Sequence, residues 1–145
     1  MARRPVAVLA AIVLLTEAVG IVVINGILAT FVDGQSMSLD GLDPGTTAVA
    51  TWALGGVLGL YLGACAVVTL RAGARGRAPG RYARALLISA AVVHGVLGVV
   101  AAGLVGWGVF GFLMVALGLI VWVLLAYGAE AGPVSGARRL RSTAP

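Results

Sequence analysis

Four long hydrophobic segments, separated by short polar stretches, divide the chain. They cover about residues 6–32, 47–70, 83–105 and 107–127. Each is near or above the roughly 20 residues that a helix needs to cross a bilayer. In lipid, every backbone polar group must be bonded within the segment, so each segment is predicted to be an α-helix. The pattern predicts an all-α membrane protein that folds as a four-transmembrane-helix bundle.

The short connections leave no room for a second folded unit. We expect a single four-helix transmembrane domain over residues 1–132 and a flexible cytoplasmic tail over residues 133–145, which is rich in Pro, Ser, Gly and Arg. Asp43 and Pro44 precede the second segment in the order typical of an N-cap and a first helical residue. Gly106 alone separates the third and fourth segments, which predicts a tight hairpin.

Composition supports the membrane assignment. The chain of 145 residues is 61% hydrophobic and only 10% charged, with a mean hydropathy of +1.09. Soluble domains are about 45–50% apolar and about 25% charged. These values exclude a soluble globular domain. The net charge of +5 does not indicate nucleic-acid binding, because the basic residues flank the hydrophobic segments.

The basic residues fall on one side of the predicted membrane. All of them are arginine, and they lie before the first segment, beside the connection between the second and third, or after the fourth. The positive-inside rule therefore predicts cytoplasmic N- and C-termini. Arginines beside a membrane also attract anionic lipid headgroups, although topology alone accounts for these. They are Arg3, Arg4, Arg71, Arg75, Arg77, Arg81, Arg84, Arg138, Arg139 and Arg141.

The localisation follows from the same features. The excess of Ala, Gly and Val, with arginine as the sole basic residue type apart from one His, suggests a GC-rich bacterial genome. We expect a multi-pass protein of the bacterial plasma membrane, with the lipid bilayer as its surroundings. Tyr82 and Tyr127 fall at the predicted inner boundary, where aromatic residues form a belt.

Glu17 is the acidic residue that lies inside a hydrophobic segment. An ionised carboxylate in hydrocarbon costs roughly 2.5–3.5 kcal/mol, so a proton, a partner, a cavity or another subunit must offset it. Counting from the inner arginines places Glu17, His94 and Tyr61 in one layer, roughly 15–20 Å into the membrane. Asn25 follows about 80° round the helix and roughly 12 Å further out, where it could line the same pathway.

The Glu–His layer has two interpretations. The pair can hold and exchange a proton, or its hydrogen bond can fix helix register or a subunit contact. Glu17, His94, Tyr61 and Asn25 are therefore candidates for proton or ligand binding. No metal, cofactor or catalytic residue is expected, because one His, one Glu and one Cys without paired spacing form no recognisable ligand set. The chain also lacks a second embedded carboxylate, so we do not expect an enzyme.

Small residues recur every four positions in two of the segments. Gly55, Gly59 and Gly63 form two overlapping GxxxG motifs, and Gly98 shares a small-residue face with His94. Such faces let another backbone approach closely, so these glycines are predicted to mediate helix packing. The partner helix can belong to the same chain, to a homo-oligomer or to a larger membrane protein.

Two functions follow from these features. The first is a non-catalytic accessory or self-associating subunit of a membrane complex, because the extramembrane mass is too small for a catalytic or sensory domain. The alternative is a proton-coupled small-molecule transporter that uses Glu17.

The run Glu17-Ala18-Val19-Gly20 resembles the first helix of the small multidrug resistance transporters. They too are short four-helix proteins with a membrane-embedded Glu in helix one. The resemblance covers one helix, and it implies that Glu17 couples protons to the export of lipophilic cations. The third segment lacks the Trp of that family's substrate motif. The whole chain looks like the small integral membrane proteins of GC-rich Gram-positive bacteria, which implies location and fold but no activity.

Overall fold

The computed structural model describes residues 3–35, 41 and 43–128. Over these residues it contains four α-helices: α1 (Arg3–Gly34), α2 (Pro44–Arg75), α3 (Arg81–Leu104) and α4 (Trp107–Gly128). All four are long and apolar enough to cross a membrane. The structure therefore confirms an all-α fold built on four hydrophobic helices. The tail predicted over residues 133–145 lies outside the described residues.

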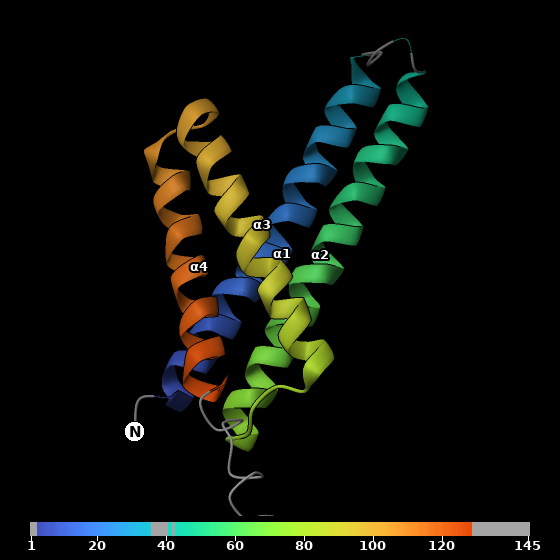
Figure 1. Ribbon diagram of the computed structural model, residues 1–145. Helices are drawn as coiled ribbons and strands as arrows, with labels where there is room; N and C mark the ends of the chain where they lie inside the picture. Colours follow the sequence, from blue (N-terminus) through green and yellow to red (C-terminus); the bar gives the residue numbers. More distant parts are fainter. Residues whose placement is uncertain (1–2, 36–40, 42, 129–145) are drawn as a thin grey trace, which may run out of the picture.

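The helices form two hairpins that converge at one end and diverge at the other (Figure 1). α1 packs along α2, and α3 packs along α4. Between the hairpins, α1 contacts α4 and α2 contacts α3. The hairpins meet at the end where α2 leads into α3, and they separate towards the opposite end, so the fold has the shape of a V (Figure 1).

The two hairpins differ in length. α1 and α2 each have 32 residues, whereas α3 has 24 and α4 has 22. At 1.5 Å per residue, α1 and α2 are about 48 Å long, which exceeds the roughly 30 Å of a hydrocarbon core. The α1–α2 hairpin leans away from α3 and α4 in Figure 1, and tilt is one way in which a long helix fits a bilayer.

Local signals fix both ends of α2. The Asp43 side chain accepts a hydrogen bond from the Thr46 N–H at 3.2 Å, with Pro44 as the first helical residue. This is the N-cap that the sequence predicts. At the other end Gly76 has a φ of 62°, and its N–H donates to the Ala72 carbonyl at 3.0 Å. A glycine in this left-handed conformation ends a helix without a Cβ clash.

Close approach of α2 to α1 depends on two of the three predicted packing glycines. A Cβ at Gly55 would lie 2.5 Å from the Asn25 Cβ, and one at Gly59 would collide with the Val22 side chain. Gly63 has open space, because no atom of the described residues lies within 4 Å of its Cβ position. Gly55 and Gly59 thus mediate packing of α2 against α1, whereas Gly63 does not take part in this contact.

Helices α3 and α4 also approach each other closely. Gly98 faces the Met114 side chain of α4, and a Cβ there would collide with it. Val105 and Gly106 alone connect the two helices, and Gly106 has a φ of 129°, which side chains rarely allow. The tight hairpin expected from the sequence is present.

The core lies where the hairpins meet. Leu14 of α1, Cys65 of α2, Leu87 of α3 and Tyr127 of α4 are all at most 1% exposed and belong to one cluster. Tyr127 was predicted to lie in the inner aromatic belt, and that prediction is wrong, because α4 turns this residue into the cluster. Tyr82 is exposed, as a belt residue would be.

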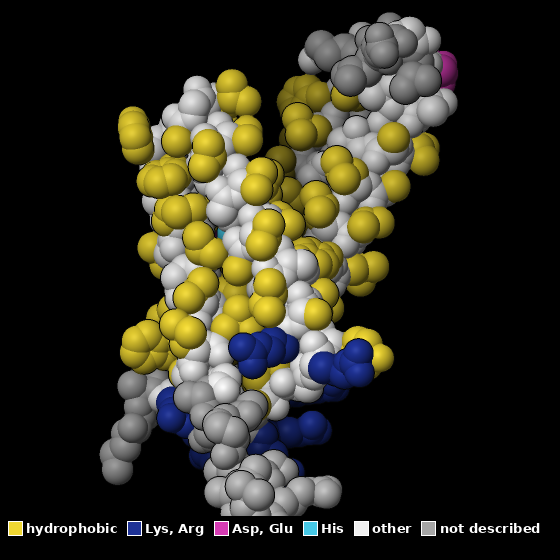
Figure 2. Space-filling view, viewed as in Figure 1, with side chains coloured by type: hydrophobic (Ala, Val, Ile, Leu, Met, Phe, Trp, Pro, Cys, Tyr) yellow, Lys and Arg dark blue, Asp and Glu magenta, His cyan; other side chains and the backbone are white. Residues whose placement is uncertain are grey.

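Charge is separated along the molecule. In Figure 2, arginine side chains gather at the convergent end of the V, and the colour of acidic side chains is visible at the opposite end. Asp33 closes α1 and Asp43 caps α2 at that divergent end. Between these ends the surface is dominated by exposed apolar side chains.

Candidate ligand-binding site

Glu17 of α1 and His94 of α3 meet between the two hairpins. Glu17 Oε2 lies 2.9 Å from His94 Nε2, and the two side chains are 8% and 3% exposed. Both helices begin at the arginine end, and both residues lie about 20 Å along them. His94 is directed towards α1 because it shares its buried face with Ala90 and Gly98. The sequence predicted only a shared depth, and the structure adds the contact.

The hydrogen bonds of His94 fix how many protons this pair holds. His94 Nδ1 lies 2.7 Å from the Ala90 carbonyl oxygen, which can only accept, so Nδ1 carries a hydrogen. The contact between Nε2 and Glu17 Oε2 then contains one further proton. Either the carboxylic acid donates to the neutral ring, or the imidazolium donates to the carboxylate. The pair has zero net charge in both forms.

The second oxygen of Glu17 has no such partner. Glu17 Oε1 is buried and accepts no hydrogen bond from the described residues. Buried polar atoms are nearly always bonded, and leaving one unsatisfied costs about 1–3 kcal/mol. An unsatisfied carboxyl oxygen thus marks a place where a hydrogen-bond donor or a cation would be stabilised.

Glu17 and His94 both line a pocket of about 410 Å³ between the hairpins. Helices α1, α2, α3 and α4 all contribute to its wall, which is almost entirely apolar. The pocket extends from the Glu17–His94 pair towards the divergent end, as far as Ile24 of α1 and Leu97 of α3. Its volume falls in the usual range of small-molecule sites, about 300–1,000 Å³. An apolar molecule with a positive charge complements such a pocket.

The other two candidates have different surroundings. Tyr61 lines the same pocket, but its hydroxyl lies 2.8 Å from Ser89 Oγ. The Ser89 hydroxyl donates to the Leu86 carbonyl, so the Tyr61 hydroxyl donates its hydrogen to Ser89 and not to the Glu17–His94 pair. Asn25 is buried against Gly55 at the α1–α2 interface, and it is not among the residues lining the pocket. In the structure, Glu17 therefore contacts His94, and the Tyr61 ring forms part of the pocket wall. Asn25 lies outside this pocket.

Sequence reasoning missed the contribution of α4 to the site. Val109, Phe112 and Leu113 close one side of the pocket, but they resemble any other residues of a hydrophobic helix. Ser89 was also missed, although a hydroxyl five residues before His94 in an apolar segment was a usable signal.

Comparisons with known proteins do not assign the chain to a family. No family model, no curated protein and no solved structure matches the chain.

Proposed function

We propose that the protein is a proton-coupled carrier of small apolar cations in a bacterial plasma membrane. The observation that carries this proposal is Glu17 Oε1, a buried carboxyl oxygen without a hydrogen-bond partner among the described residues, in an apolar pocket of about 410 Å³. Imperfect helix packing alone would not explain a carboxyl group in the pocket wall, because an apolar residue at this position would avoid the cost of burying a carboxyl group.

The coupling between cation binding and proton release follows from charge balance in the pocket. The Glu17–His94 pair is neutral while it shares its proton. When a monovalent cation enters, loss of that proton leaves one negative charge beside one positive charge, and the pocket stays neutral. An uncompensated charge in this apolar surrounding is costly, so cation and proton exclude each other. Such mutual exclusion is the thermodynamic requirement for exchange.

The proposed orientation has both chain ends in the cytoplasm. It is supported by the arginines at the convergent end and the acidic residues at the divergent end (Figure 2). In this orientation the pocket extends towards the outside. Transport then requires the two hairpins to rock about the region of the Glu17–His94 contact, so that they close at the divergent end and separate at the convergent end, which opens the pocket to the cytoplasm.

Proton release on ligand addition tests this function. Benzyltrimethylammonium and neopentylbenzene have nearly the same shape, but only the first is charged. In weakly buffered detergent solution, the cation is expected to release about one proton per binding site, and the neutral molecule none. A pH-indicator dye measures this release. If both compounds leave the pH unchanged while the cation binds, proton coupling is excluded.

A second candidate function is a self-associating or accessory subunit of a membrane complex. The observation that favours it is an unused face of α4. Within the described part of the chain, Gly111 and Gly118 have nothing within 4 Å of their Cβ positions, and Trp122 on the same face is half-exposed. Glycines without a packing partner among the described residues are available to a neighbouring helix.

The native mass distinguishes this candidate. For a subunit that associates through this α4 face, Gly118→Leu is expected to reduce the native mass in gentle detergent to that of the single chain. Gly95→Leu is the control, because Gly95 of α3 also has open space around it. A wild-type protein that already runs as a monomer, without a bound protein, would rule the candidate out.

A further inference from the structure

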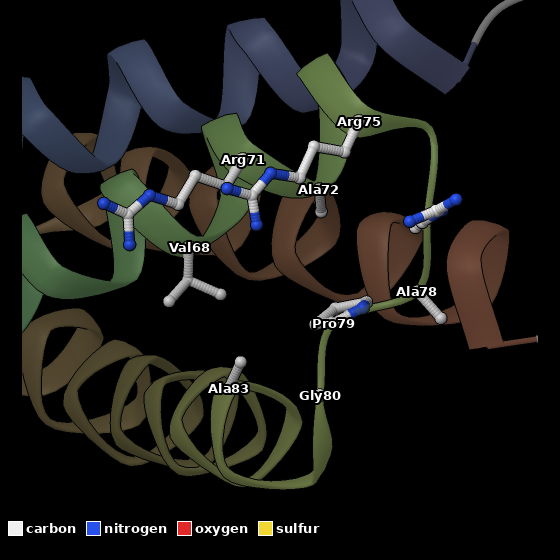
Figure 3. Close-up of a pocket in the computed structure, with 9 residues that line it drawn as sticks. Val68, Arg71, Ala72, Arg75, Ala78, Pro79, Gly80 and Ala83 are labelled. Atoms are coloured by element: carbon white, nitrogen blue, oxygen red, sulfur yellow. The ribbon is translucent and has the colours of Figure 1, made fainter.

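A second pocket lies at the arginine end, between the last turns of α2 and the first turn of α3 (Figure 3). Its volume is about 290 Å³, and its charged lining residues are Arg71, Arg75 and Arg77. Neither Asp nor Glu is among its lining residues. Of the acidic residues that the structure describes, Asp33 and Asp43 are at the far end and Glu17 is in the membrane pocket. These guanidinium groups therefore have no carboxylate to neutralise them in this part of the described chain.

The arrangement of the arginines is more specific than topology requires. The positive-inside rule places arginines in this connection, but it does not direct several of them to one pocket. Arg71 and Arg75 are one helical turn apart, and in Figure 3 their side chains extend along the same side of α2. Like charges at this spacing repel each other. Arg81 and Arg84 come from the same arginine-rich region, but they do not line the pocket.

The remaining lining residues are suited to a phosphate with an apolar attachment. Val68 and Ala83 point into the space between α2 and α3 (Figure 3). Gly80 also lines the pocket, and it precedes α3 without a side-chain cap on the helix. The first N–H groups of α3 thus add partial positive charge to that of the guanidinium groups.

We propose that this pocket binds the phosphate headgroup of an anionic phospholipid. Arginine forms bidentate hydrogen bonds with phosphate oxygens, and the pocket supplies both the guanidinium groups and an apolar floor. A lipid is favoured over a free phosphate because the pocket lies where two membrane-length helices end, at the level of the headgroups. The occupied pocket would hold α2 and α3 together at the connection between the two hairpins.

Native mass spectrometry with matched variants tests the proposal. The full-length protein is reconstituted in nanodiscs that contain equal amounts of phosphatidylglycerol and phosphatidylcholine, and the lipids that remain bound after release are counted. The double variant Arg71→Gln/Arg75→Gln is expected to retain phosphatidylglycerol about tenfold less than the wild type, because it loses charge-assisted hydrogen bonds. The control Arg81→Gln/Arg84→Gln removes the same charge outside the pocket and is expected to retain the lipid.

Three outcomes would overturn the proposal. Equal loss of phosphatidylglycerol in both double variants would mean that only the overall charge attracts the lipid. Equal retention of phosphatidylcholine and phosphatidylglycerol by the wild type would exclude an anionic headgroup. If inorganic phosphate, added to lipid-free protein in detergent, raises the Tm as much as phosphatidylglycerol does, the ligand is a free phosphate and not a lipid. Circular dichroism of each variant confirms that the helices are retained, so that loss of binding is not loss of folding.

Discussion

Glu17→Gln is expected to bind benzyltrimethylammonium at least about tenfold more weakly than the wild type and to release no proton when it does. Gln keeps the size of the side chain, and its amide can donate to His94 Nε2 at the place where the carboxyl group now lies 2.9 Å away. The variant therefore retains the contact between α1 and α3 but lacks the exchangeable proton and the negative charge. Binding and proton release are measured together by titration calorimetry in buffers of different ionisation enthalpy.

Thr16→Val provides the matched control for this variant. Thr16 lines the same pocket, but its hydroxyl donates to the Ile12 carbonyl at 2.9 Å and is not part of the proton pair. The control changes the wall of the pocket and leaves its charge unchanged, so proton release should persist. If Glu17→Gln still releases a proton on cation binding, the proton comes from elsewhere, and Glu17 then has a structural role in linking the hairpins.

Gly59→Ala is expected to lower the free energy of unfolding by about 1–3 kcal/mol, the usual cost of overpacking. The new methyl group would collide with the Val22 side chain and lie 3.2 Å from the Ala18 carbonyl oxygen. Gly63→Ala, one turn further along α2, meets nothing within 4 Å and gains the helix propensity of alanine. It should be neutral or more stable by up to about 1 kcal/mol.

Unfolding of both glycine variants in SDS, followed by circular dichroism, measures this difference. Gly59 faces α1 of its own chain, so the loss should be in stability, with the native mass unchanged. Equal unfolding midpoints for Gly59→Ala and Gly63→Ala would contradict the packing described for α1 and α2. A lower native mass for Gly59→Ala would instead assign this glycine face to a contact between chains.

The number and type of the helices could be predicted because hydrophobic length is a strong signal in a membrane protein. The depth of the candidate site could also be predicted, since Glu17 and His94 are each a known number of residues from an arginine-rich helix start. Depth does not determine which faces meet. The contact between the two side chains depends on how α1 and α3 rotate and on the order of helices in the bundle, which periodicity alone does not encode.

Two predictions about individual polar residues illustrate the same limit. Asn25 lies at a depth suitable for a pathway, but its helix face packs against Gly55 of α2. Tyr127 has the position of a belt residue in the sequence, yet α4 turns it into the core, where it is 1% exposed. In each case the distance along the helix was informative, whereas the direction of the side chain was set by neighbours that are remote in sequence.

The separation of Glu17 from His94 along the chain has a consequence for biosynthesis. The two residues are 77 positions apart. At 5–20 residues per second, the ribosome adds His94 about 4 to 15 seconds after Glu17. Both helices of the α1–α2 hairpin are synthesised before His94, and the hairpin closes through its own contacts. During insertion Glu17 enters the membrane without its imidazole partner, and the cost of a bare carboxylate favours entry in the protonated form. The newly made hairpin would thus already carry the proton that His94 comes to share.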